Sequence, residues 1–200
     1  MELPENLGLH RLRRGALRGM QGQILELGMG TGRNIPLYPP AVEHLSGIDP
    51  DEAMLRQARR RADKASFPIE LLLAFAEDLP FEEDSFDAVV GTLVFCTVSD
   101  PPQALREVRR VLKPRGGFHL LEHVRMERKP IARMQEKATP LWKHVAGGCH
   151  LDRDTLGMVR DAGFEVGRVE SHLGGLFLNI FARSPGLERS RLAPGCTGHL

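Results

Sequence analysis

The sequence contains little cysteine, few aromatic residues and almost no excess charge. Its three cysteines, Cys96, Cys149 and Cys196, lie far apart and form no CxxC pair. Neither a disulfide framework nor a zinc site is therefore expected, and no metal ligands are predicted, which fits a reducing cytoplasm. A formal net charge of +1 also gives no electrostatic basis for a nucleic-acid partner.

Long apolar runs are also missing. No segment approaches the roughly 20 apolar residues that cross a bilayer, and residues 1–15 lack the apolar core of a secretory signal. We therefore expect a soluble, cytoplasmic protein without a transmembrane segment. The one basic cluster, Arg11, Arg13, Arg14 and Arg18, is most simply a solvated helix face. Weak contact with an anionic membrane surface is the alternative.

What the sequence does contain is a regular alternation of apolar segments with segments of helical spacing. The continuous apolar segments are residues 23–28, 44–49, 69–75, 86–95 and 117–124. Strands of this kind are typical of a parallel sheet that helices cover on both faces. Helical spacing marks residues 8–20, 51–65 and 101–112. A further helix is expected from Arg33 to Tyr38, where Pro39 and Pro40 cut it short. We therefore predict a doubly wound α/β sheet.

After residue 124 the pattern changes. Apolar residues at helical spacing over 131–145 predict a helix that Pro140 interrupts, and a second helix ends at Gly163. Residues 164–170 and 176–182 then predict two strands joined as a hairpin.

A glycine-rich turn follows the first predicted strand, in the sequence Glu26-Leu27-Gly28-Met29-Gly30-Thr31-Gly32. Residues without a Cβ let a ligand approach the backbone closely. Asp49 ends the next predicted strand, about 20 residues later, where an acid reaches a ribose diol in nucleotide-binding units. The pair predicts a nucleoside site.

Two classes of ligand compete for this site. A dinucleotide fold needs a third glycine where Arg33 stands, and it places a pyrophosphate against the helix N-terminus, close to the negative charge of Glu26. S-adenosylmethionine has no phosphate and carries an α-ammonium, which Glu26 can favour directly or through water. Charge therefore favours the methyl donor, and a nicotinamide-dependent oxidoreductase is the alternative.

Four motifs between residues 23 and 124 resemble those of the Class I methyltransferases of the ubiquinone/menaquinone C-methyltransferase type. They are ILELGMGTGRN, GIDPDEAML, AEDLPFEEDSFDAVV and REVRRVLKPRGG. The resemblance implies a Rossmann-like sheet of seven strands in the order 3-2-1-4-5-7-6, with the last strand antiparallel. The segments NIPLYPP, GTLVFCTV, EHV and PLWKHVAGGCHLDRDT are similar to an alkyl-thiol methyltransferase-like subgroup.

The resemblance also implies a set of residues that bind S-adenosylmethionine. They are Glu26, Gly28, Met29, Gly30, Asp49, Pro50, Met54, Ala76, Glu77 and Leu93. The first four would serve the methionine moiety, Asp49 the ribose hydroxyls, the next four the adenine, and Leu93 the carboxylate end of the methionine. Many relatives have an aspartate where this chain has Phe75, so Glu77 or a backbone carbonyl would accept the bond from the adenine amino group.

The acceptor side is expected after the fifth predicted strand. Methyl transfer from a sulfonium chiefly requires positioning of the acceptor, and a base is needed only if the acceptor must lose a proton. His123 is the candidate catalytic base, with local packing as the alternative. Trp142 is predicted to anchor the core or a lid, with a substrate platform as the alternative. Cys149 is predicted to be a packed thiol, with a reactive thiol as the alternative, and Cys96 to lie in the core.

The sequence therefore predicts methyl transfer from S-adenosylmethionine to a small apolar or amphipathic acceptor such as a thiol or phenol, leaving S-adenosylhomocysteine. The alternatives are a lipid or quinone methyltransferase at a membrane surface and a non-catalytic module that binds S-adenosylmethionine. We expect one domain over residues 1–183, with an N-terminal helical cap (1–22), an acceptor-side lid (125–152) and a flexible tail (184–200). The acceptor, the attacked atom and the oligomeric state are left open.

Overall fold

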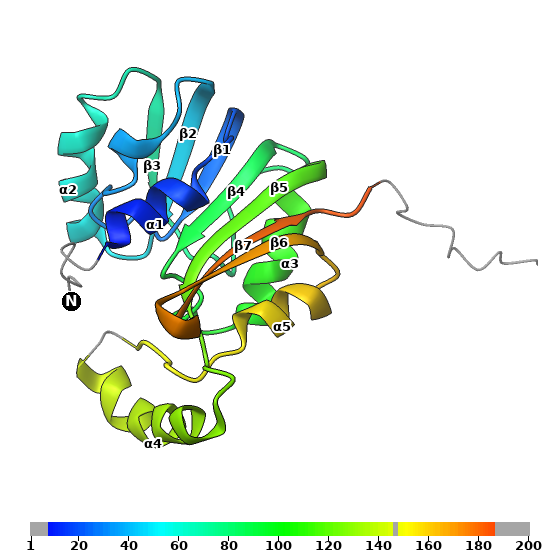
Figure 1. Ribbon diagram of the computed structural model, residues 1–200. Coiled ribbons are helices and arrows are strands. Elements are labelled where there is room, and N and C mark those ends of the chain that lie inside the picture. The colour runs from blue at the N-terminus through cyan, green and yellow to red at the C-terminus, as the bar shows by residue number, and fades with distance from the viewer. Residues whose placement is uncertain (1–7, 146–147, 187–200) are drawn as a thin grey trace, which may run out of the picture.

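The computed structural model describes residues 8–145 and 148–186 and is built on one seven-stranded sheet (Figure 1). The sheet order is β3-β2-β1-β4-β5-β7-β6. β7 pairs antiparallel with both β5 and β6, and the remaining neighbours are parallel. The strands are β1 (Gly22–Leu27), β2 (Val42–Asp49), β3 (Ile69–Leu73), β4 (Phe86–Thr92), β5 (Leu112–His123), β6 (Glu165–His172) and β7 (Phe177–Arg183). The predicted order and the antiparallel strand are confirmed.

Helices cover both faces of this sheet, as the apolar strands require. The helices of the described residues are α1 (Leu9–Ala16), η2 (Ile35–Leu37), α2 (Glu52–Ala62), α3 (Pro101–Val111), α4 (Lys129–Val145), α5 (Thr155–Asp161) and η3 (Leu173–Gly175). One buried core joins the sheet to η2, α2 and the residues after α1, and a second joins it to α3 and α5. The two cores hold the carboxyl ends of β1, β2 and β4 in fixed register.

Helix α2 begins where the sequence predicts. The Asp51 side chain accepts hydrogen bonds from the backbone N–H groups of Ala53 and Met54, which would otherwise lack partners in the first turn.

We expect Asp51→Ala to lower the free energy of unfolding by about 1 kcal/mol, the usual cost of losing an N-cap. Chemical denaturation of the purified variant measures this. A loss below a few tenths of a kcal/mol would show that the cap contributes little.

Several predicted boundaries differ from the structure; β5, for example, begins at Leu112 rather than residue 117. Two further differences share a cause. β4 ends at Thr92 rather than residue 95, because Leu93 adopts a left-handed backbone with φ 61° and turns the chain. The helix expected from Arg33 is only the short η2. Apolar character alone does not separate a buried turn from the end of a strand, so both differences arise where the backbone turns inside the core.

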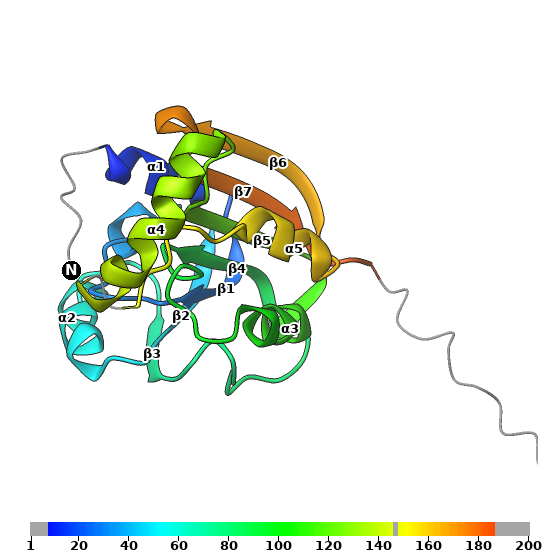
Figure 2. The ribbon, with the colours of Figure 1, turned by 90° about the horizontal axis from the view of Figure 1, so that it is seen from below.

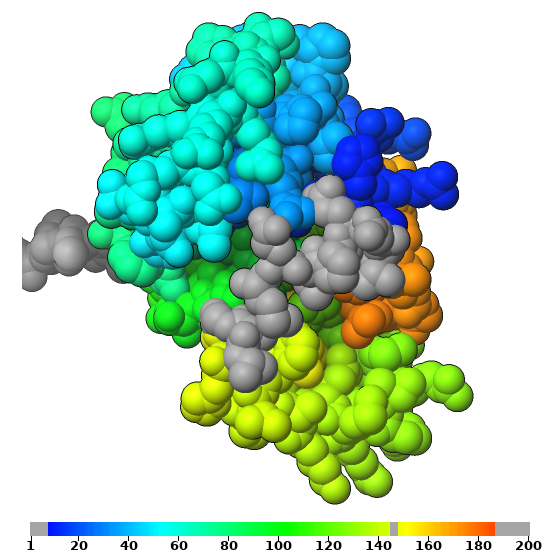
Figure 3. All heavy atoms as spheres, turned by 90° about the vertical axis from the view of Figure 1, so that its left-hand side faces the viewer, coloured from blue at the N-terminus to red at the C-terminus, as the bar shows by residue number. Residues whose placement is uncertain are grey.

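Helix α4 lies beyond the carboxyl edge of the sheet (Figures 1 and 2), and Pro140 lies within it without ending it. Its exposed side carries Met134 and Leu141, which are 63% and 75% exposed; in Figure 3 the helix projects from the body of the molecule. Its buried side carries Gln135, whose amide bonds Met126 N and the Val124 carbonyl. The apolar stripe predicted over residues 131–145 is therefore buried only in part, since Met134 and Leu141 face solvent.

The ends of the domain follow the prediction in part. Ser184 is buried and its N–H donates to the Gly116 carbonyl, so the chain remains attached to the sheet where the tail was expected to begin. Residues 1–7 of the predicted cap and 187–200 of the predicted tail lie outside the described residues. In the part of the chain that is described, no helix combines the length and apolar character that a bilayer span requires.

Candidate active site

The glycine turn leaves the end of β1 and packs tightly against the loop after β4. Gly28 and Gly30 both have left-handed backbones, with φ 59° and 55°. A Cβ on Gly28 would lie 2.5 Å from Cγ2 of Val94, whereas a Cβ on Gly30 would have only the Gly28 carbonyl within 4 Å, at 3.9 Å. Position 28 therefore requires glycine because a side chain would clash with Val94. Position 30 requires it chiefly because of its left-handed backbone.

Asp49 ties the glycine turn to the start of α2. Its Oδ2 accepts from the N–H of Gly30 at 2.8 Å, and its Oδ1 accepts from the N–H of Asp51 at 2.9 Å. Each carboxylate oxygen keeps a further acceptor site for a ligand hydroxyl. Burial raises the pKa of this carboxyl above its ordinary value, against the lowering effect of the two backbone bonds.

Glu26 lies on β1 directly beneath this turn and is buried. Oε1 accepts from the Asn34 amide and Oε2 from the Tyr38 hydroxyl, both at 2.7 Å. Burial raises the pKa of the carboxyl to about 7, although both hydrogen bonds and the charge of Arg13 lower it. Near neutral pH the Glu26 carboxyl is therefore partly protonated and partly ionised. A cation beside it would favour the ionised form.

Sequence reasoning missed the polar partners around Glu26. Arg13 of α1 donates through Nη1 to Asn34 Oδ1 at 3.1 Å and to Thr92 Oγ1 at 2.7 Å. Arg13 therefore leaves the solvated basic face to which the sequence assigned it and reaches the carboxyl edge of the sheet. Asn34 and Thr92 stand in segments quoted above for their resemblance, which gave neither residue a role, and Arg13 is 13 residues away from Glu26 along the chain. Only the fold shows that the three meet.

Of the residues expected around the adenine, Pro50 is exposed, Met54 half-buried and Ala76 buried. The Glu77 side chain bonds the protein backbone instead. Its Oε1 accepts from the N–H groups of Ser99 and Asp100, which join the loop after β3 to the start of α3. Its carboxylate is thus committed to the protein, and a backbone group at this loop is the better candidate partner for an adenine amino group.

Met29 places its side chain in the core. The side chain is 3% exposed and packs against Gly47, and its N–H donates to the Ile48 carbonyl. Leu93 occupies the opposite side of the turn with its strained left-handed backbone, held by a 2.7 Å bond from its N–H to the Leu121 carbonyl. Strain of this kind collects at functional sites.

The last two residues of β5, Glu122 and His123, have buried side chains with different partners. Glu122 Oε1 accepts from the N–H groups of Val94 and Phe95, and burial raises the pKa of this carboxyl to about 7. His123 Nε2 lies 2.8 Å from Cys149 Sγ. Glu122 therefore shapes the loop after β4, and His123 lies toward the segment that follows α4.

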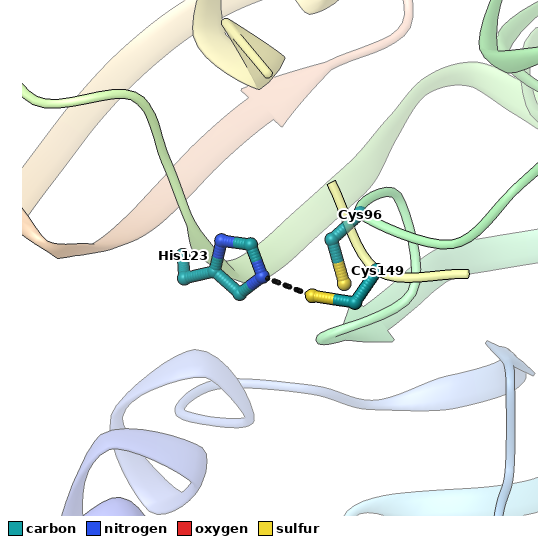
Figure 4. A group of neighbouring side chains, drawn as sticks. All are labelled: Cys96, His123 and Cys149. Carbon is teal, nitrogen blue, oxygen red and sulfur yellow. Dashed lines mark hydrogen bonds between the residues drawn. The ribbon is translucent and has the colours of Figure 1, made fainter. Parts of the chain in front are cut away.

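The two cysteines expected to be separate packing groups meet at His123 (Figure 4). Cys96 is buried as predicted, and Cys149 also accepts from Trp142 Nε1 at 3.4 Å. Hydrogen bonds from Cys96, His123 and Trp142 lower the pKa of the Cys149 thiol to about 4. Burial lowers the pKa of His123, but the bond to Cys149 and the charges of Cys149 and Glu122 together raise that pKa overall. These hydrogen bonds therefore favour the thiolate form of Cys149.

Residues 25–120 match the family model described as "Methyltransferase domain". Over these residues, from β1 to β5, the chain is similar to the methyltransferase family. The fold agrees with this match. A solved S-adenosylmethionine-dependent methyltransferase from Thermotoga maritima aligns with 90% of this chain and 93% of its own, at a TM-score of 0.67 and 26% identity.

Two curated relatives of this methyltransferase domain have different acceptors in their names. The thiol S-methyltransferase TMT1B of Homo sapiens is 36% identical over 160 residues, which is 77% of this chain and 65% of the relative. The phosphatidylethanolamine N-methyltransferase of Cereibacter sphaeroides is 32% identical over 63% of this chain and 62% of the relative. The chain thus spans about two thirds of the length of these relatives.

Proposed function

We propose that this methyltransferase domain transfers the methyl group of S-adenosylmethionine to the sulfur of a small apolar thiol, leaving S-adenosylhomocysteine. The observation that carries the donor assignment is the pair of carboxyls around the glycine turn. Glu26 lies beneath it and Asp49 beside it, an arrangement that suits a cationic, phosphate-free nucleoside and opposes a pyrophosphate. The residues predicted to bind the donor are kept, with Met29 and Glu77 contributing backbone only.

The similarity to a thiol S-methyltransferase supports sulfur as the attacked atom. The acceptor would enter between the end of β5 and the segment 125–152, which the proposal keeps as the lid. Trp142 and His123 both contact Cys149 there, which makes a site of aromatic, imidazole and sulfur groups. These soft, polarisable groups suit a thiol better than a charged headgroup.

Transfer requires the acceptor sulfur to lie in line with the donor's sulfonium–methyl bond. Holding it there is worth roughly 7–11 kcal/mol of the barrier. The thiol must also lose its proton, since the thiolate is the nucleophile. His123 is the candidate proton acceptor, because an acceptor thiol at this position would compete with Cys149 for Nε2.

We also place this activity in the cytoplasm. Cys96 and Cys149 are free thiols side by side, and an oxidising compartment would join such a pair. The partner is a small molecule rather than a nucleic acid.

The test is a methylation assay on the purified chain with radiolabelled donor and three acceptor classes: alkyl thiols, phenols, and vesicles that contain phosphatidylethanolamine. Label on the thiols alone supports the proposal. Label on the lipid instead would support the second candidate, which the lipid methyltransferase relative favours. Tight donor binding with no label on any acceptor would identify a binding module.

Donor affinity is expected to depend on pH through Glu26. The carboxyl, with its pKa of about 7, is ionised at pH 8 and protonated at pH 6, and only the ionised form stabilises the donor's ammonium. Affinity for S-adenosylhomocysteine should therefore fall about tenfold from pH 8 to pH 6, with proton release on binding near pH 7. Calorimetry in buffers of different ionisation enthalpy measures both. Glu26→Gln should flatten the dependence, and an unchanged slope in that variant would contradict the assignment.

A further inference from the structure

Three ligand-type side chains converge beside the donor site from three parts of the chain. Cys96 lies in the turn after β4, His123 ends β5, and Cys149 lies in the segment that follows α4. One ring nitrogen of the histidine and the two sulfur atoms all lie within 4.8 Å of one another, and Figure 4 shows the three side chains directed toward one another. Local sequence spacing does not produce this cluster, because 26 residues separate His123 from Cys149.

We propose that Cys96, His123 and Cys149 bind one Zn²⁺, and that the fourth coordination position takes the sulfur of the acceptor thiol. The inference rests on the proposed thiol methylation and deepens it. Two thiolates and an imidazole form a donor set that zinc prefers. Three protein ligands with one open position are typical of catalytic rather than structural zinc sites.

The geometry of the cluster fits this ion with a small adjustment. Zinc bonds of about 2.3 Å to sulfur and 2.0–2.1 Å to nitrogen, arranged tetrahedrally, separate the ligand atoms by roughly 3.5–3.8 Å. The His123 Nε2 to Cys149 Sγ distance is 2.8 Å, so this pair must open by about 0.7 Å. Cys149 lies outside the sheet, between α4 and α5, so it can move without displacing a strand.

The surroundings of the cluster favour a bound divalent cation. Cys96 and His123 are 3% and 7% exposed, and two thiolates would neutralise the ion, which removes most of the cost of burying it. Trp142 Nε1 donates to Cys149 Sγ and would orient that ligand from outside. Arg153 donates to the carbonyls of Phe95 and Val98, so it holds the turn that carries Cys96.

Coordination would take over the role given above to His123 as a base. A thiol bound to zinc is deprotonated outright, and its proton passes to solvent. The bound thiolate then uses a sulfur electron pair to form a bond to the donor's methyl carbon. The bond between that carbon and the sulfonium breaks, its electron pair stays on the donor sulfur, and a neutral thioether product leaves. No oxidant or reductant is needed.

The first experiment measures metal binding by the full chain, reduced, stripped with a chelator and kept under inert gas. One equivalent of Zn²⁺ per chain is expected, and Co²⁺ in its place should give thiolate-to-cobalt charge transfer and four-coordinate d–d absorption. Loss of an outer-shell partner already costs about 10–100-fold in metal affinity, so Cys96→Ser and Cys149→Ser should each cost more. The matched controls are Cys196→Ser, outside the described residues, and His150→Gln, outside the cluster; both should bind like the parent chain.

The second experiment separates this proposal from the proposed function. Calorimetry with S-adenosylhomocysteine should give the same affinity with and without Zn²⁺, whereas thiol methylation should fall on stripping and return with Zn²⁺. A stripped chain that methylates thiols at the full rate would overturn the zinc site and leave thiol methylation standing. The zinc site would also be overturned if Cys196→Ser lost as much metal as Cys96→Ser and Cys149→Ser, or if the reduced parent chain retained no metal. Absence of donor binding in every form would instead refute the proposed function.

Discussion

Replacement of Asp49 by alanine is expected to weaken binding of S-adenosylhomocysteine by about 100-fold or more. Hydrogen bonds to a charged group contribute about 1.5–3 kcal/mol each, and the proposal gives Asp49 two ribose hydroxyls. The variant also loses the bonds from Gly30 N and Asp51 N that hold the turn against α2. Isothermal calorimetry at pH 8 gives the dissociation constant directly.

Two companion variants separate the ribose contact from damage to the loop. Asp51→Ala removes a neighbouring carboxylate that caps α2 and should leave donor affinity within about threefold of the parent, since a cap mainly affects helix stability. Asp49→Asn keeps the shape of the side chain but removes its charge, and it should fall between Asp49→Ala and the parent. Parent-like binding by Asp49→Ala would remove this residue from the site.

Gly28→Ala is expected to lose most donor binding and a large part of its folding stability. The left-handed backbone at φ 59° costs a residue with a Cβ about 1–2 kcal/mol. The new methyl group would also lie 2.5 Å from Val94 Cγ2, and overpacking of this kind costs about 1–3 kcal/mol. Thermal unfolding and calorimetry with S-adenosylhomocysteine measure the two losses.

Gly30→Ala is the matched control for this prediction. It has nearly the same backbone angle, φ 55°, but its Cβ would meet no atom closer than 3.9 Å. It should therefore show the backbone cost without the clash. Val94→Ala should restore part of the stability lost in Gly28→Ala and none of that lost in Gly30→Ala. Equal losses in the two glycine variants, or no rescue, would show that the contact with Val94 is unimportant.

Much of the fold could be predicted from the sequence. The segments over β1, β2, β4 and β5 are continuously apolar because helices cover both faces of the sheet. This need for apolar side chains on both faces can be read directly from the sequence. The strand order came from the family resemblance rather than from periodicity. The glycine turn and Asp49 were also predictable, since both depend on local backbone chemistry at the ends of adjacent strands.

The acceptor side could not be predicted in the same way. Whether Cys96 and Cys149 are packed thiols or neighbours of His123 depends on where the segment after α4 returns to the sheet, and no local pattern encodes that path. Helix α4 shows the same limit. Its periodicity indicates an amphipathic helix, but the amide of Gln135 bonds the backbone of Val124 and Met126, so a polar residue faces inward and Met134 faces solvent.

The insertion of β7 beside β5 has a consequence for how such a chain diverges. β7 pairs with β5 as far as His123, opposite Phe177, while β4 borders the other side of β5. Pairing with β4 ends at Leu121, so β7 alone pairs with the last two residues of β5, and the proposed donor contacts lie on several strands and loops. The described residues between 125 and 152 form no strand and bear few such constraints. Under the proposed function, a change of acceptor would need substitutions in one contiguous segment only, and the donor half of the domain would keep its residues.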